Sequence, residues 1–316
     1  MGDEVVLGVD AGGTHTRCLV VGLDGRVRGH GRAGGANQRS SADPAAAFVD
    51  AVAATLHEAG PVRVTGAVFG VAGAGAAGLA RAEETVQRAW SALGLPGRPE
   101  VGDDIGVAFA AGTAEASGAV LIAGTGAVAA AVRDGRIERR CDGCGWLLGD
   151  EGSAVWIGIA GLRAALAALD GRGCDTVLTE RLPAALGVPV GDQQALIGAA
   201  YAVAPAELGA LAPPVCAAAE DGDKAAAEIV ADAAARLLQS LAAVVAEPVR
   251  PPLVLSGAVL REGPVAERVH EALLERYGVR PVVAAPGEYG AAALALRRAG
   301  RPARLHEELL DQARAG

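Results

Sequence analysis

The sequence contains few aromatic residues: phenylalanine, tryptophan and tyrosine make up 3% of its 316 residues. It also lacks an uninterrupted apolar run long enough to cross a bilayer, and no basic-plus-apolar leader opens it. The hydrophobic content of 51% comes largely from alanine, valine and leucine, a composition that is typical of globular proteins. We therefore expect a cytoplasmic protein with no membrane partner.

The sequence has no excess of positive charge either. Its 28 lysines and arginines are outnumbered by 37 aspartates and glutamates, which gives a formal net charge of −9. Such a chain does not attract nucleic acid by its overall charge, so we expect no nucleic-acid partner. Any phosphate ligand must then be held by local backbone dipoles, by a metal ion, or by both.

The five cysteines are odd in number and scattered, which is not typical of a secreted disulfide framework. Cys141 and Cys144 form a single CxxC pair. This pair alone is weak evidence for zinc, because a structural zinc site needs four ligands.

The clearest chemical signal lies between residues 120 and 153. Val120 to Ala123 form a short apolar run, typical of a buried strand, that ends at Gly124-Thr125-Gly126. Glycines let the backbone approach a ligand closely, and successive N–H groups in such a turn can bind an anion. Further on, Gly149-Asp150-Glu151-Gly152-Ser153 places two carboxylates just before a helical pattern over Ala154 to Leu169. A phosphate-binding turn followed by an acidic loop indicates phosphoryl transfer.

The N-terminus repeats this arrangement. An apolar run from Val5 to Val9 ends at Asp10, and Gly12-Gly13-Thr14 and a second apolar run follow. Asp24-Gly25 then corresponds to Asp134-Gly135 as a hairpin turn. The repeat predicts duplicated domains, with chance similarity in an alanine- and glycine-rich chain as the alternative.

Strands alternate with helices through both halves, which predicts an α/β fold. We place the domains at 1–115 and 116–316, the second with a helical insertion and with a C-terminal helix that can pack back on the first. A last strand is expected over Val279 to Val283, at an edge because of Pro281.

The ordered motifs Asp10-Ala11-Gly12-Gly13-Thr14, Ala123-Gly124-Thr125-Gly126, Gly149-Asp150-Glu151-Gly152-Ser153 and Ser256-Gly257 resemble the N-acetylglucosamine kinase and BadF-type ATPase family. This family belongs to the actin/hexokinase/Hsp70 superfamily, and the resemblance covers nearly the whole chain. It implies two ribonuclease-H-like (actin-like ATPase) domains with an interdomain cleft, ATP and Mg²⁺ as cofactors, and a homodimer.

The resemblance also implies a nucleotide site. Two glycine turns would cover the terminal phosphates, and later turns would leave room for the adenosine. The residues concerned are Gly12, Gly13, Thr14, Gly124, Thr125, Gly126, Ser256, Gly257 and Gly290. Asp10 would hold Mg²⁺, usually through water. The alternative is that the turns are structural only.

By the same resemblance, the catalytic base is an aspartate that begins the helix after Val101, and Asp103 and Asp104 are the candidates. The base must accept a proton from a sugar hydroxyl as the bond to phosphorus forms. The spacing to the small residues of the helix favours Asp104. The alternative is that one of the pair simply caps the helix, and both roles can hold, one for each residue.

The sugar-binding residues implied by the resemblance are Asn37, Cys141, Asp150, Glu151 and Ser153. An amide such as that of Asn37 offers a donor and an acceptor, which suits a sugar diol. The alternatives are that Asn37 shapes a turn, that Cys141 is a structural thiol, and that the three residues of the acidic loop cap a helix.

The resemblance therefore implies an ATP-dependent kinase that acts on an amino sugar, N-acetylglucosamine or glucosamine, at the 6-hydroxyl. Ala127-Val128 stand where the family usually has serine and a polar residue, so ATP binding is better supported than the particular sugar. One alternative is an activator ATPase of a CoA-dependent reductase or dehydratase, in which Cys141 and Cys144 would bind an iron–sulfur cluster. Another is a non-catalytic sugar sensor, against which Asp10, Asp104 and both glycine turns argue.

Overall fold

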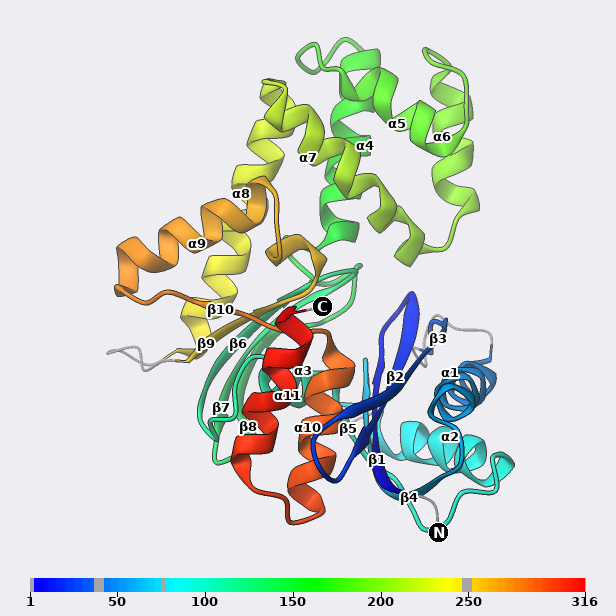
Figure 1. The fold of residues 1–316 in the computed structure, drawn as a ribbon. Coiled ribbons are helices and arrows are strands. Elements are labelled where there is room, and N and C mark those ends of the chain that lie inside the picture. The colour runs from blue at the N-terminus through cyan, green and yellow to red at the C-terminus, as the bar shows by residue number, and fades with distance from the viewer. Residues whose placement is uncertain (1–2, 37–42, 76–77, 246–251, 316) are drawn as a thin grey trace. The chain divides into compact units, whose positions relative to one another are not determined.

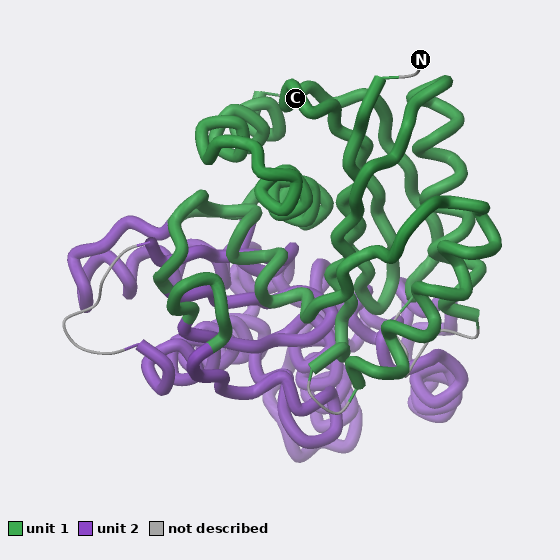
Figure 2. The backbone as a smooth tube through the Cα atoms, turned by 90° about the horizontal axis from the view of Figure 1, so that it is seen from below, with its two compact units in different colours: residues 1–118, 132–137, 282–316 green, residues 119–131, 138–281 purple. Residues whose placement is uncertain are grey.

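The computed structural model describes residues 3–36, 43–75, 78–245 and 252–315. Contacts divide the chain into two compact units (Figure 2). Unit 1 consists of residues 1–118, 132–137 and 282–316, and unit 2 of residues 119–131 and 138–281. The domain boundary at 115/116 stays a prediction.

Unit 1 is built on a sheet with the strand order β3-β2-β1-β4-β5 (Figure 1). Its strands are β1 (Asp3–Ala11), β2 (His15–Gly22), β3 (Val27–Gly34), β4 (Val62–Val71) and β5 (Glu100–Asp103). The first three strands are antiparallel neighbours, whereas β4 runs parallel to β1 and β5 runs parallel to β4.

Helices cover both faces of this sheet. Because side chains alternate along a strand, Val5, Leu7 and Val9 of β1 pack in the same cluster as residues of α1 (Pro44–Ala59) and α2 (Leu79–Ala92). Val6 points to the other face, where α3 (Asp104–Ala110), α10 (Gly287–Arg298) and α11 (Ala303–Ala315) pack. Gly8 and Asp10 share the face of Val6 by the same alternation.

Three of the few aromatic side chains meet on the first of these faces. The ring centroids of Phe48 and Phe69 are 5.5 Å apart, and those of Phe69 and Trp90 are 6.1 Å apart, both edge to face. The indole N–H of Trp90 donates to the carbonyl of Pro96 at 3.1 Å. These three aromatic side chains thus fill a large volume in this core.

Within unit 2 the strand order is β9-β6-β7-β8. These strands are β6 (Gly118–Ala123), β7 (Ala127–Arg133), β8 (Arg136–Asp142) and β9 (Leu253–Ser256). The order repeats that of β4-β1-β2-β3 in unit 1, and β9 is parallel to β6 as β4 is to β1. The matching orders support the predicted duplication. The last strand of the chain, β10 (Val282–Val283), is shorter than expected and begins just after Pro281.

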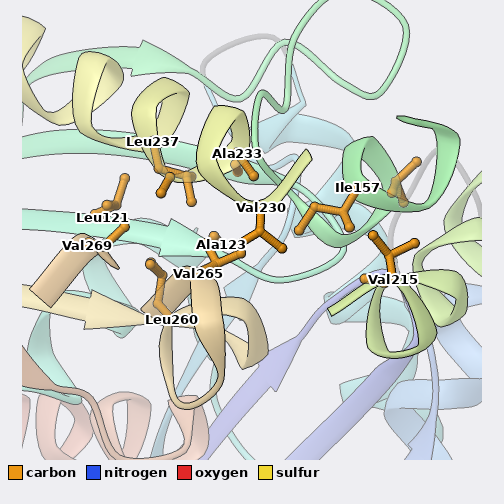
Figure 3. Packing of buried hydrophobic residues seen from close by; sticks show 14 of the residues in the cluster. Leu121, Ala123, Ile157, Val215, Val230, Ala233, Leu237, Leu260, Val265 and Val269 are labelled. Carbon is orange, nitrogen blue, oxygen red and sulfur yellow. The ribbon is translucent and has the colours of Figure 1, made fainter. Parts of the chain in front are cut away.

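The rest of the described part of unit 2 is mainly helical. Its elements are α4 (Ala154–Leu169), α5 (Leu178–Leu186), α6 (Gln193–Ala202), η1 (Pro205–Leu211), α7 (Ala212–Glu220), α8 (Lys224–Val244), η2 (Ala258–Leu260) and α9 (Pro264–Tyr277). Figure 3 shows Leu121 and Ala123 of β6 packed with Val230 and Leu237 of α8. In the described part of the chain, no helix is long and apolar enough to span a membrane.

The contact between β1 and α10 generates a test of the unit 1 packing. A methyl group at Gly8 would overlap backbone atoms of Ala292 and Glu288. We therefore expect Gly8→Ala to lower the free energy of unfolding by about 3 kcal/mol. The control is Gly66→Ala in β4, where the nearest atom to a new Cβ is Val6 Cγ1 at 3.9 Å. Urea denaturation that shows equal stability for the two variants would contradict this packing.

Candidate active site

The predicted residues of unit 1 gather at the carboxyl edge of its parallel strands. Ala11 of β1 lies beside Val71 of β4, and Val71 lies beside Asp103 of β5. The turn after β1 and the start of α3 after β5 are therefore at the same edge. In open α/β sheets this edge is where ligands bind.

The turn at Gly12, Gly13 and Thr14 is closed by backbone hydrogen bonds. The N–H of Gly12 donates to His15 O at 2.9 Å, and the N–H of Ala36 donates to Gly12 O at 3.3 Å. Gly35 lies so close to the turn that a Cβ there would overlap the carbonyl of Gly13. The backbone after β3 thus packs on the turn, while Asn37, our predicted sugar ligand, lies outside the described residues.

The two candidate bases have different positions at the start of α3. Asp103 is the N-cap residue, and its side chain accepts from the N–H of Ile105 at 2.9 Å. Asp104 is the first residue of the helix and is half-buried. Because Asp103 serves the capping role, the arrangement favours Asp104 as the base, which stays a prediction.

The Asp10 carboxyl lies against the first residue of α10. A Cβ on Gly287 would overlap this carboxyl, so only glycine fits there. The next residue, Glu288, is 7% exposed. Burial, and secondarily the charge of Glu288, raise the pKa of Asp10 from 3.8 to about 6 against the opposing effect of Arg17.

Sequence reasoning missed Glu288, although an acidic residue in the first turn of the helix after Pro286-Gly287 was the signal available. Two carboxyl groups that repel each other in a buried setting suit a divalent cation, because its charge offsets both the burial and the repulsion. The residues at this position therefore fit Mg²⁺, and Asp10 as its ligand stays a prediction.

Unit 2 gathers its predicted residues in the same way. Gly124, Thr125 and Gly126 join β6 to β7, with the N–H of Gly124 donating to Gly126 O at 2.9 Å. Ile122 of β6 lies beside Ser256 of β9. The turn at Ser256-Gly257 is therefore next to the turn at residues 124–126. A Cβ on Gly257, whose φ is 96°, would overlap the carbonyl of Ala123.

Gly290, the last residue that we assign to the nucleotide site, does not lie with the glycine turns of unit 2. It belongs to unit 1, where a Cβ would overlap the carbonyl of Val107 in α3. Its missing side chain is thus explained by the close approach of α10 to α3. The assignment of Gly290 to the adenosine stays a prediction.

The acidic loop places Asp150 against the glycine turn at residues 124–126. A Cβ on Gly126 would lie 2.8 Å from Asp150 Oδ2, and Asp150 itself has a φ of 54°. Burial raises the pKa of Asp150, as does the nearby charge of Asp142, while a hydrogen bond from the N–H of Ala127 lowers it. The structure thus brings together two motifs that are well separated in the sequence.

The other predicted sugar ligands have partners inside unit 2. Glu151 forms an ion pair with Arg236 of α8, whose guanidinium lies 5.0 Å from the centroid of the Trp156 ring. Ser153 is fully buried and accepts from the N–H of Trp156 at 3.2 Å as the N-cap of α4. Cys141 is half-buried and packs on the hydrophobic cluster. These contacts favour anchoring roles, and sugar contacts by these three residues stay predictions.

The setting of Asp10 leads to a stability prediction. Asp10→Asn should raise the free energy of unfolding of the metal-free protein at pH 7.5, by on the order of 2 kcal/mol. The amide removes a charge that burial and Glu288 disfavour. Because the folded-state pKa of about 6 lies above the ordinary 3.8, the advantage of the variant should disappear as the pH falls from about 6 towards 4.

Urea denaturation in the presence of a chelator, at pH 7.5 and at pH 4.5, measures this difference. Asp50→Asn, at an exposed position of α1, is the matched control. An Asp10→Asn variant that is less stable than the wild type at pH 7.5 would contradict the inference that burial disfavours the charged form of Asp10.

Comparisons of the sequence with known proteins agree with these motifs. A family model described as the BadF/BadG/BcrA/BcrD ATPase family matches residues 7–295. An N-acetylmuramic acid/N-acetylglucosamine kinase from Clostridium acetobutylicum is 31% identical over 180 residues. This match covers 55% of the chain and 58% of the kinase, so the chain spans little more than half the length of this curated relative.

Solved structures with the same fold include sugar kinases. Candidate N-acetylglucosamine kinases from Chromobacterium violaceum and Porphyromonas gingivalis give TM-scores of 0.74 and 0.71 at 24% and 20% identity. The alignments cover 92% and 93% of this chain and 98% and 99% of theirs. A ROK family glucokinase from Streptomyces griseus, in complex with glucose and AMPPNP, gives 0.59 at 19% identity over 93% of this chain and 99% of that one.

The expected α/β fold of the actin-like ATPases is therefore confirmed. The family model covers most of the chain, and the glycine turns at the ends of β1 and β6 lie within the matched residues. The chain belongs to the BadF/BadG/BcrA/BcrD ATPase family.

Proposed function

We propose that the protein is an ATP-dependent sugar kinase whose substrate is an amino sugar, phosphorylated at the 6-hydroxyl. The observation that carries the proposal is the position of Asp150 against Gly126, which sets a carboxylate that can bind hydroxyl groups beside a turn that can bind phosphate. The similarity to the Clostridium acetobutylicum kinase supports the same chemistry.

In this proposal unit 1 provides the base and the metal ligand. Asp104 accepts the proton of the sugar hydroxyl. At the same time the hydroxyl oxygen forms a bond to the γ-phosphorus, and the bond between this phosphorus and the leaving ADP breaks. Asp10 holds Mg²⁺, which when bound neutralises charge on the phosphate groups. In the turn of Gly12, Gly13 and Thr14, the N–H of Gly12 bonds His15 O, while Gly13 and Thr14 supply backbone N–H groups and a hydroxyl for the phosphates.

Unit 2 provides the second phosphate turn and the sugar loop. The N–H of Gly124 closes the turn on Gly126 O, so the N–H groups of Thr125 and Gly126 are the ones that contact phosphate. The lack of a side chain at Gly257 leaves room for the flat base. Asp150 accepts hydrogen bonds from sugar hydroxyl groups. The N–H of Ala127 already bonds this carboxylate, which helps to hold it in place.

Fewer observations bear on the identity of the sugar than on the phosphoryl transfer. Ala127 is 4% exposed and Val128 is half-buried, so neither brings a polar group to the region beside Asp150. We infer that discrimination for the N-acetyl group is weak. A cytoplasmic location and a homodimer stay predictions.

The role of Asp104 is tested by Asp104→Asn. We expect turnover to fall by roughly 10²–10⁴-fold, because the amide cannot accept the proton, while ATP and sugar dissociation constants stay close to those of the wild type. Asp103→Asn is the matched control, because asparagine also caps helices well. An active Asp104→Asn and an inactive Asp103→Asn would transfer the role to Asp103.

The substrate is tested by measuring ADP release with N-acetylglucosamine, glucosamine and glucose. We expect phosphorylation of both amino sugars, with kcat/KM values that differ by less than about tenfold, because no polar side chain at 127 or 128 reads the N-acetyl group. A strong preference for N-acetylglucosamine over the other two would overturn the weak discrimination. If none of the three sugars is phosphorylated, the proposal of a sugar kinase is wrong, and the activator ATPase becomes the function to test.

A further inference from the structure

Asp142, the last residue of β8, binds the backbone of the acidic loop with its side chain. Its Oδ1 accepts from the N–H of Asp150 and its Oδ2 from the N–H of Glu151, both at 2.8 Å. The N–H of Cys144 also approaches Oδ1 at 3.4 Å. One carboxylate thus holds the two peptide groups that carry the acidic side chains of the loop.

The surrounding backbone is shaped around this carboxylate. A Cβ on Gly149 would overlap Asp142 Oδ1, so the glycine before Asp150 is needed for the contact. On the other side, Arg140 donates to the carbonyl of Gly143 at 2.7 Å and to the carbonyl of Asp142 at 3.2 Å. The segment from 142 to 150 is therefore closed by polar contacts at its base.

Hydrophobic burial does not hold this segment. Trp146, Leu147 and Leu148, between the two ends of the loop, are 48%, 73% and 81% exposed. Since these apolar side chains face solvent, they contribute little to fixing the loop. Polar contacts hold the loop instead, and among them the hydrogen bonds of Asp142 are the ones made to the N–H groups of Asp150 and Glu151. Bonds to a charged acceptor are stronger than those between neutral groups.

We propose that Asp142 is the positioning residue of the sugar loop: by binding the N–H groups of Asp150 and Glu151 it sets the direction in which the Asp150 carboxylate points. This inference rests on the proposed function, since Asp150 is the group that it presents to the sugar. It assigns a role to a residue that the proposed chemistry does not use.

A different explanation is that Asp142 only allows a turn. Its φ is 65°, a conformation that glycine adopts without strain and that aspartate and asparagine tolerate. The two roles separate cleanly in Asp142→Gly, which keeps the turn and removes the carboxylate. A turn-only residue would be replaced by glycine without loss.

The kinetic experiment compares Asp142→Gly and Asp142→Asn with the wild type, using the amino sugar that the wild type phosphorylates best. For Asp142→Gly we expect KM for the sugar to rise by roughly ten- to a hundredfold, with KM for ATP unchanged. Asp142→Asn keeps one acceptor oxygen and should give an intermediate rise. Asp134→Gly is the control, because Asp134 has a φ of 50° in the hairpin turn between β7 and β8. It should leave both KM values unchanged.

A second measurement needs no substrate. Hydrogen exchange of peptides that cover residues 145–152 should speed up in Asp142→Gly and not in Asp134→Gly, while thermal melting checks that each variant is folded. Wild-type protection and a wild-type KM in Asp142→Gly would overturn the proposal. If the wild type phosphorylates no sugar, the proposed function fails, and the exchange result alone decides whether Asp142 holds the loop. Should Asp142→Gly fail to fold, Asp142→Asn decides by the same two measurements.

Discussion

The close packing of α10 on β1 is the contact on which the arrangement of unit 1 depends. Gly8 lets the backbone of the helix approach the strand, and two residues later the same face carries Asp10. The helix therefore begins with Gly287 against the Asp10 carboxyl and with Glu288 close by. One contact made by a residue without a side chain thus fixes both carboxyl groups.

This arrangement is unfavourable for folding by itself. A carboxyl whose pKa is raised to about 6 is held where its charged form is disfavoured. The hydrophobic cluster between β1, α10 and α11, with Val6, Leu296 and Leu309 fully or almost fully buried, offsets that cost. Functional sites often lower stability, and favourable contacts elsewhere in the fold compensate for the loss.

Much of the fold follows from local sequence signals. The glycine turns, the hairpin turns and the helix over Ala154 to Leu169 occur where they were predicted, because apolar periodicity and glycine act over short distances. The capping of α3 by one of the two neighbouring aspartates also follows from the chain, since an N-cap precedes its helix, and Asp103 is that residue. The base role of Asp104 stays a prediction.

What the sequence does not reveal are partners that only folding brings together. Arg236 is 85 residues from Glu151, and Glu288 lies at the opposite end of the chain from Asp10. In the sequence, Asp142 is an ordinary polar residue at the end of a strand, and only the fold shows that it binds the N–H groups of Asp150 and Glu151. Local sequence patterns do not predict such contacts.

The exposed tip of the acidic loop also gives the protein an optical property. The chain has three tryptophans: Trp90 is 2% exposed in unit 1, Trp156 lies beneath the guanidinium of Arg236, and Trp146 is 48% exposed on the loop held by Asp142. A soluble quencher therefore reaches Trp146 far more readily than Trp90. The quenchable part of the tryptophan emission therefore includes the indole on the loop that carries Asp150, and no label has to be attached.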